Sequence, residues 1–255
     1  MPFQPVQSEK LSTAVVRQIE LLILRGILRP GERLPSEREL AERLGVSRPS
    51  LREAIGELQQ SGLLAARAGS GVYVAEVLGS AFSPALVRLF GTHEEAVNDY
   101  VAFRRDLEGL AAERAAKYGS DLDLKVIDQA YRRMEAAHDG RNPARDAELD
   151  AAFHMAIIEA SHNVVMLHMM RSMYELLREG VFYNRGQMFQ RASWREDLLA
   201  QHKAINDALQ ARDGAGARAA IGRHMDYVES ALAAQRKSDR NAAIARQRIE
   251  HDNVR

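Results

Sequence analysis

The sequence predicts a mostly α-helical protein, made of an N-terminal winged helix-turn-helix and a larger all-α helical bundle. Apolar residues recur at three- and four-residue spacing through most of the 255 residues, which is the pattern of a buried helix face. Strand patterns are confined to two short segments near residue 70. A stretch that contains Gly79-Ser80 and Ser83-Pro84 interrupts the helical pattern, so we expect a linker there.

The first two helices are expected at residues 11–25 and 37–44. The apolar pattern of the first helix ends at Gly26. Ser36, with Glu39 three residues later, has the pattern of a capping box, in which each side chain bonds the other residue's backbone amide. Ser36 is therefore the expected N-cap of the second helix.

A third helix follows the short turn Gly45-Val46-Ser47. Ser47 is the expected N-cap of a helix over 48–60, and Pro49 fits its first turn because the amide that proline lacks would be unpaired there anyway. Two short helices joined by such a turn form a helix-turn-helix. The residues expected at the close contact between these two helices are Ala41, Gly45, Leu51 and Ile55.

A β-hairpin is expected directly after the third helix. Its strands are 63–67 and 72–75, and Gly69-Ser70-Gly71 forms its tip, because glycine adopts the positive φ angles that a tight hairpin needs. A hairpin in this position is the wing of a winged helix-turn-helix. We expect Arg67 and Gly69 to approach a minor groove or the DNA backbone.

The third helix carries polar side chains at its N-terminal end, which is the end that enters the major groove in helix-turn-helix proteins. Arginine can make paired hydrogen bonds to guanine, and hydroxyl groups suit phosphate. An isolated helix pair with surface arginines is more often an ordinary structural corner, but the glycine-tipped hairpin that follows favours DNA binding. The expected DNA-contacting residues of this helix are Ser47, Arg48, Ser50 and Arg52.

The C-terminal part has an almost continuous helical pattern, interrupted at turn-forming residues. We place the winged helix-turn-helix at 1–78, a linker with a short helix at 79–92, the bundle at 93–236 and a polar tail that frays at 237–255. The helices expected in the bundle are 94–118, 122–138, 144–160, 163–186, 194–212 and 215–236.

The composition limits the classes of function. The 35 Lys and Arg residues equal the 35 Asp and Glu residues, so an assignment to DNA binding depends on local placement and not on net charge. Because the chain has no cysteine, disulfides, thiolate nucleophiles and cysteine-based metal sites are excluded, and a metal must be held by His, Asp or Glu. We find no signal-peptide pattern and no uncharged apolar run of about 18 residues, so we expect a cytoplasmic protein with no membrane segment.

Three histidines and one aspartate occupy core-type positions on three of the predicted helices. His202 and His224 each stand in an apolar stripe where a leucine would be expected. Asp150 and His154 are four residues apart and therefore share one helix face. A single histidine in such a stripe is more often a hydrogen-bonded core residue, whereas one divalent cation would satisfy all four groups together. On the residues alone, both interpretations stay open.

The N-terminal part contains the segment LRPGERLPSERELAERLGVSRPSLREAIGELQQSGLLAARAGSGVYV. Over residues 10 to 76 the chain closely resembles the winged-helix domain of the GntR family of bacterial regulators. In that family one arginine of the PSER segment and two of the recognition helix make the main DNA contacts, and the resemblance assigns these roles to Arg38, Arg48 and Arg52. The glycine of the wing tip corresponds to Gly69. The resemblance also implies a homodimer on a palindromic double-stranded operator.

The C-terminal part contains LDAAFHMAIIEASHN and QHKAINDAL, followed by a histidine 22 residues after His202. These segments resemble the all-helical FCD effector domain of the same family. In its metal-containing members an Asp-x3-His pair and two later histidines bind a divalent metal, usually zinc. The resemblance assigns that role to Asp150, His154, His202 and His224, with nickel or manganese as alternatives to zinc.

The same resemblance implies a small-molecule effector. Members of this branch hold the effector's carboxylate with an arginine on the first effector-domain helix, where FRRDLEGLAAERAA places Arg104, and Arg105 fits less well. A 2-oxo or 2-hydroxy carboxylate could chelate the open positions of a metal with four protein ligands. We expect pyruvate, with L-lactate or glycolate as alternatives, and a repressor that releases DNA on binding it.

Three other functions are weighed against this one. The metal itself could be the signal, or it could be purely structural. A metalloenzyme is the third alternative, because a site of three histidines and one carboxylate could do hydrolytic or oxidative chemistry. The sequence has no evident general base or nucleophile beside the four residues, and the attached DNA reader favours sensing over catalysis.

Overall fold

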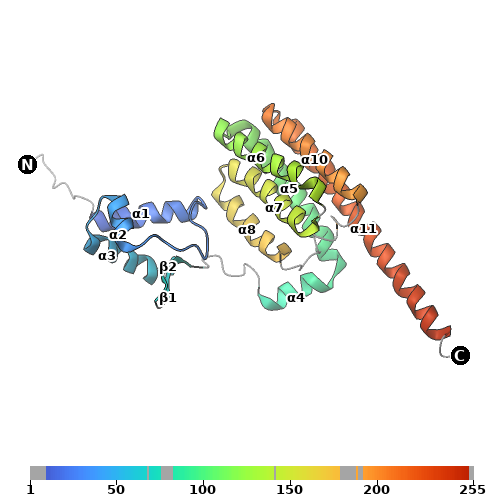
Figure 1. The fold of residues 1–255 in the computed structure, drawn as a ribbon, viewed down its shortest axis with the longest axis horizontal. Coiled ribbons are helices and arrows are strands. Elements are labelled where there is room, and N and C mark those ends of the chain that lie inside the picture. The colour runs from blue at the N-terminus through green and yellow to red at the C-terminus, as the bar shows by residue number, and fades with distance from the viewer. Residues whose placement is uncertain are drawn as a thin grey trace, which may run out of the picture. The chain divides into compact units, whose positions relative to one another are not determined.

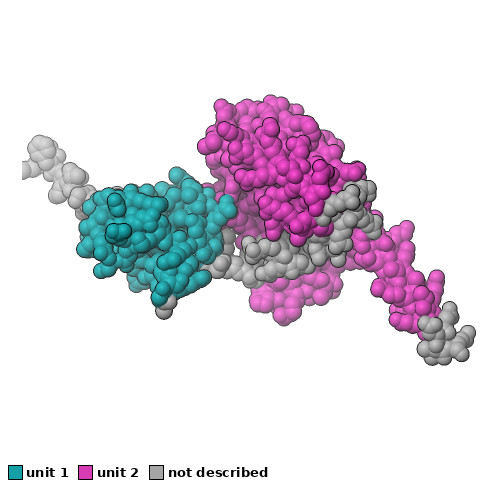
Figure 2. Space-filling view, in the orientation of Figure 1, with its two compact units in different colours: residues 1–81 teal, residues 82–255 magenta. Residues whose placement is uncertain are grey.

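The computed structural model describes residues 10–67, 69–75, 83–140, 142–178, 188 and 192–252. The chain divides into two compact units, residues 1–81 and 82–255 (Figure 2). Helices dominate the described residues, which contain one two-stranded antiparallel sheet. The fold class is therefore confirmed. Of the expected linker, residues 79–82 lie outside the described residues, and the short helix expected within it is α4, Pro84–Thr92.

The first unit consists of three helices and a hairpin (Figure 1). Its helices are α1 (Leu11–Leu24), α2 (Glu37–Leu44) and α3 (Arg48–Gln60). Helix α3 packs against both α1 and α2, and its apolar face forms the centre of a small core. The fully buried members of that core on α3 are Leu51, Ala54 and Leu58. Both expected N-caps are present, since Ser36 accepts a hydrogen bond from the amide of Glu39 and Ser47 from the amide of Ser50.

Two expectations for α2 need correction. The capping box is only half formed, because the Glu39 carboxylate accepts a hydrogen bond from Arg43 (2.5 Å) in the next turn. Gly45 does not lie at a close helix contact. A Cβ built at Gly45 would meet nothing within 4 Å. The residue is glycine for a different reason: it ends α2 with a φ of 64°, which side chains with a Cβ rarely adopt.

The hairpin is formed by β1 (Leu64–Arg67) and β2 (Gly71–Val74), paired from Leu64↔Val74 to Arg67↔Gly71. Gly69 has a φ of 69°, as expected for the tip. Arg33 adds a single bridge to Tyr73, which ties the segment before α2 to the wing.

The second unit is a bundle in which five helices form a closed ring. Helix α5 packs on α11 and α7, α6 packs on α7 and α10, and α10 packs on α11. The apolar faces of these helices meet in the interior, where residues such as Phe153, Ile205 and Ile221 are fully buried. The helices of this unit are α4 (Pro84–Thr92), α5 (Glu94–Tyr118), α6 (Asp121–Ala137), α7 (Pro143–Ala160), α8 (Val164–Arg178), α10 (Ala192–Gln210) and α11 (Gly214–Asp252).

The expected helices agree with the observed ones except at two ends. Residues 179–186 of the expected helix 163–186 lie outside the described residues. The second difference is a correction: α11 does not end at 236 but continues to Asp252, past the other helices of its unit (Figure 1). Residues 237–251 are exposed, and Arg240 approaches Glu94 of α5 only at 4.0 Å, so tertiary packing contributes little to holding them. They contain neither glycine nor proline, and three Ala and three Arg residues among them favour the helix without packing.

Candidate metal centre and nucleic-acid interface

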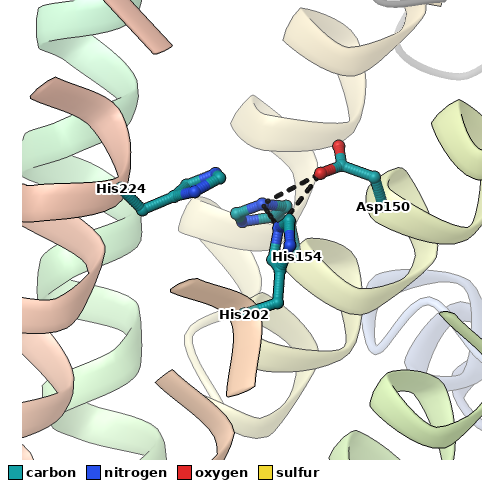
Figure 3. Close-up of side chains that lie close together, drawn as sticks. All are labelled: Asp150, His154, His202 and His224. Atoms are coloured by element: carbon teal, nitrogen blue, oxygen red, sulfur yellow. Dashed lines mark hydrogen bonds and ion pairs between the residues drawn. The ribbon is translucent and has the colours of Figure 1, made fainter. Parts of the chain in front are cut away.

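The four residues singled out by their core-type positions come together inside the bundle. Asp150 and His154 project from α7, His202 from α10 and His224 from α11, and their side chains point toward one another (Figure 3). One ligand atom from each lies within 4.8 Å of the others. All four residues are buried, with exposed fractions of 4% or less.

The distances within the cluster fit one shared cation. The Nε2 atoms of His154 and His202 are 3.2 Å apart. Oδ1 of Asp150 lies 3.1 Å from Nε2 of His202 and 3.7 Å from Nε2 of His154. Two imidazole nitrogens bound to one Zn²⁺ at about 2.0–2.1 Å each would lie roughly 3 Å apart. The cluster can therefore hold a divalent metal with little movement.

The electrostatics of the cluster keep two histidines neutral, which is the form that binds metal. Burial lowers the pKa of His202. Burial, together with its two histidine neighbours, lowers the pKa of His224 well below its ordinary value. His154 differs, because the Glu108 and Asp150 carboxylates outweigh burial and raise its pKa.

Two residues that the sequence analysis did not single out contact the outer nitrogens of the histidines. Oε2 of Glu108, on α5, lies 2.6 Å from Nδ1 of His154. Oε1 of Gln201 lies 2.9 Å from Nδ1 of His224, so the histidine donates to the amide oxygen. Both contacts direct Nε2 toward the centre of the cluster, as carboxylate and amide partners do for metal-binding histidines.

The DNA-facing residues expected on the helix-turn-helix lie at its surface. Arg38 is exposed on α2, and the side chains of Arg48 and Arg52 on α3 are 58% and 62% exposed. Ser47 and Ser50 contact each other through their hydroxyl oxygens at 2.9 Å. The three arginines are thus accessible at the surface of this unit.

The wing carries a second basic group. The guanidinium of Arg67 lies over the ring of Tyr73, 4.3 Å from its centroid, in the geometry of a cation–π contact. Ser70 and Tyr73 share a hydrogen bond of 2.5 Å between their hydroxyls, which braces the tip next to the exposed Gly69.

Within the described part of the chain, no helix is long and apolar enough to span a bilayer.

Two family profiles match the chain. The profile of bacterial regulatory proteins of the gntR family covers residues 11–74, and the FCD domain profile covers residues 99–227. The chain belongs to the GntR family and carries an FCD domain. The first match spans the helix-turn-helix and wing, and the second spans all four members of the buried cluster.

Relatives of this GntR-family regulator match it over most of its length. The Glc operon transcriptional activator of Escherichia coli K12 is 34% identical over 221 residues, covering 86% of this chain and 87% of the relative. The putative L-lactate dehydrogenase operon regulatory protein of the same strain is 32% identical over 252 residues, covering 97% and 96%. Among solved structures, E. coli McbR/YncC matches with a TM-score of 0.50 at 20% identity, covering 89% of this chain and 99% of that one, which supports the fold.

Arg104, expected to hold an effector carboxylate, lies inside the FCD domain next to the cluster. Its side chain is 1% exposed, and its Nε donates to Oε1 of Glu108 at 2.6 Å. Its Nη2 donates to the hydroxyl of Tyr174 at 3.1 Å, and that hydroxyl donates to Glu108 at 3.0 Å. Arg105 points elsewhere: it is 32% exposed and pairs with Asp226 and Glu229.

Glu108 joins Arg104 to a cluster histidine. Burial opposes its ionisation, but Arg104 and His154 outweigh burial and lower its pKa far below the ordinary 4.5. It is therefore a buried anion with two cationic or donor partners. The i,i+4 spacing of Arg104 and Glu108 between apolar residues of α5 was the one signal in the sequence that could have indicated this pair.

A pocket between α6, α7 and α10 reaches His202. Its wall contains Arg195, a second buried arginine that the sequence analysis did not single out, which donates to Asp146 at 2.8 Å and to the carbonyl oxygen of His138. The pocket gives the cluster one approach, through His202. The lining residues are Met134, His138, Asp146, Leu149, Arg195, Leu199 and His202.

Proposed function

We propose that this GntR-family chain is a transcriptional regulator whose operator affinity is set by a small 2-oxo or 2-hydroxy carboxylate bound at a divalent metal in the FCD domain. The proposal rests on one observation above all: three histidines and an aspartate meet in the buried interior of the FCD domain, within 4.8 Å of one another. Burying four such polar groups without a shared partner would be costly.

The metal would be held by Asp150, His154, His202 and His224, and zinc suits this donor set best. With these four protein ligands, a six-coordinate cation would keep one or two positions open, to which a chelating carboxylate could bind. Arg104 would donate to the same carboxylate. Its Nε is engaged by Glu108, so the effector would be met by the terminal nitrogens of the guanidinium.

The N-terminal unit would read the operator through Arg38, Arg48 and Arg52. Four further residues would complete the contact surface: Ser47, Ser50, Arg67 and Gly69. A homodimer would place two recognition helices one helical turn apart on a palindromic operator. Effector binding would shift the population toward a pose of the two winged helices that fits the operator less well, so DNA would be released. The relative named for the L-lactate dehydrogenase operon supports L-lactate beside pyruvate and glycolate as the effector.

Calorimetric titration tests the metal and the effector together. Pyruvate, L-lactate and glycolate are titrated into zinc-loaded protein, and each titration is repeated after chelation. We expect one acid to bind only in the presence of metal. His202→Ala should abolish this binding, while the matched control His162→Ala, a histidine that is 56% exposed and pairs with Asp123, should retain it.

The titrations, together with operator affinity and unfolding temperature measured with and without zinc, distinguish the alternatives. If no acid binds but zinc alone changes the affinity for an operator selected from random DNA, the metal is the signal. If zinc raises the unfolding temperature and neither acid binding nor operator affinity responds, the metal is structural. Either result would overturn the proposed effector.

A further inference from the structure

Glu37 lies at the centre of the surface that we assign to DNA recognition. It is the first residue of α2, and its side chain is 37% exposed. Its Oε2 accepts a hydrogen bond of 2.8 Å from Nε of Arg52 and lies 3.7 Å from Nη2 of Arg48. One carboxylate thus engages both recognition-helix arginines.

A carboxylate in this position weakens the electrostatic attraction to DNA. The duplex carries one negative charge per about 1.7 Å of its axis, and a glutamate between two arginines cancels part of their attraction for phosphate. The ion pairs of Glu37 add little to the stability of the fold, since exposed ion pairs contribute only about 0–1 kcal/mol. The contact geometry indicates a role in recognition instead.

The hydrogen bond from Arg52 uses Nε and not a terminal nitrogen. Among the residues that the structure describes, the two terminal nitrogens of this arginine have no hydrogen-bond partner. Those terminal nitrogens form the fork that bonds O6 and N7 of guanine. Glu37 therefore restrains the guanidinium while leaving its base-reading edge outward.

We propose that Glu37 is a specificity-determining residue, which holds Arg52 for base contacts and opposes the use of Arg48 and Arg52 on phosphate. On an operator, Arg52 can keep its bond to Glu37 and reach a guanine with its terminal nitrogens. On unrelated DNA, the arginines must turn to phosphates, which leaves the carboxylate facing the backbone without a cation. The penalty falls mainly on nonspecific binding.

Glu37→Gln in the full-length chain tests this inference, which rests on the proposed DNA contacts of Arg48 and Arg52. The substitution keeps the shape and an acceptor oxygen but removes the charge. Glu39→Gln is the matched control, because Glu39 lies in the same helix turn and pairs with Arg43 away from the recognition arginines. An operator is first selected from a random duplex library with the wild-type protein. Dissociation constants are then measured for the operator and for a scrambled duplex.

We expect Glu37→Gln to bind the scrambled duplex more tightly and to lower the ratio of operator to scrambled affinity by at least about fivefold, the lower end of what one guanine contact discriminates. Reselection with the variant should relax the preference at the base read by Arg52. Glu39→Gln should leave the ratio unchanged. If Glu37→Gln shifts both affinities by one factor, or leaves both unchanged while circular dichroism shows a folded protein, the inference is wrong.

Arg52→Ala separates this inference from the proposed function. If Arg52→Ala leaves operator binding intact, the assignment of the DNA contacts fails. If Arg52→Ala removes discrimination but Glu37→Gln does not, only the role of Glu37 fails.

Discussion

Replacing Glu108 by Gln tests whether the buried network around the cluster controls metal affinity. The carboxylate lies 2.6 Å from Nδ1 of His154 and accepts hydrogen bonds from Arg104 at 2.6 Å and from Tyr174 at 3.0 Å. Loss of such an outer partner weakens metal binding by about 10- to 100-fold, or roughly 1.4–2.8 kcal/mol. We expect an effect of this size for Glu108→Gln.

The substitution also affects folding, and the two effects must be separated. Removing one partner of a buried ion pair costs about 3–5 kcal/mol, because Arg104 keeps its charge in a site that is 1% exposed. The double variant Arg104→Met/Glu108→Gln removes both charges. It should recover most of the stability and still bind metal as weakly as the single variant, because the contact to His154 is lost in both.

Zinc affinity is measured by competition with a chromophoric chelator at pH 8, well below the unfolding temperature. This pH matters because Glu108 raises the pKa of His154 despite its burial, so at lower pH a proton competes with the metal in the wild type. Glu113→Gln is the matched control on the same helix, since Glu113 pairs with Arg218 at 2.9 Å and is 45% exposed. An unchanged zinc affinity in folded Glu108→Gln would refute the orienting role.

Three further predictions concern stability. Gly45→Ala should lower the free energy of unfolding by about 1 kcal/mol, because its φ is 64°, whereas Gly56→Ala, at an exposed helical position with an open Cβ site, should raise it by about 0.5–1 kcal/mol; chemical denaturation measures both. In metal-free protein, burial lowers the native pKa values of His202 and His224. The stability that these two residues contribute is therefore complete above their ordinary pKa of 6.5 and is lost as pH falls from there through the native values. The free energy of unfolding should change by about 1.4 kcal/mol per pH unit per proton, and a thermal unfolding series from pH 8 to 5 that stays flat would contradict this. Deleting residues 237–255 should leave the unfolding temperature of the bundle unchanged, because the described residues 237–251 are exposed, and a clear drop in calorimetry would show that they pack on something.

The features that local sequence patterns predict well are those decided by a few neighbouring residues. Ser36 and Ser47 cap their helices as expected because each bonds an amide three residues away. Gly45 was expected at the close contact between α2 and α3, which the structure does not contain at this residue. The backbone angle, and not the packing, requires glycine there.

The candidate centre was predicted in part, because the positions of its residues on each helix form a local pattern. Histidines in apolar stripes indicate buried polar groups, and the family resemblance supplied their grouping, which only tertiary packing of α7, α10 and α11 could bring about. The contacts of Glu108 and Gln201 with the histidines could not be predicted, since each joins residues of two different helices. The end of α11 was missed because exposed polarity was taken to mean fraying, whereas helix-favouring residues extend a helix without any packing.

The two arginines to which we assign ligand contacts, one in each unit, are held in the same way. Arg52 donates its Nε to Glu37 at 2.8 Å, and Arg104 donates its Nε to Glu108 at 2.6 Å. In each case the bond at Nε restrains the guanidinium. Burial separates their consequences: the first pair is 62% and 37% exposed and the second 1% and 1%. Water screens the exposed pair, so loss of Glu37 should change which DNA is bound and barely change stability. The buried pair has no such screening, so loss of Glu108 should change stability, metal affinity and the position of the Arg104 guanidinium together.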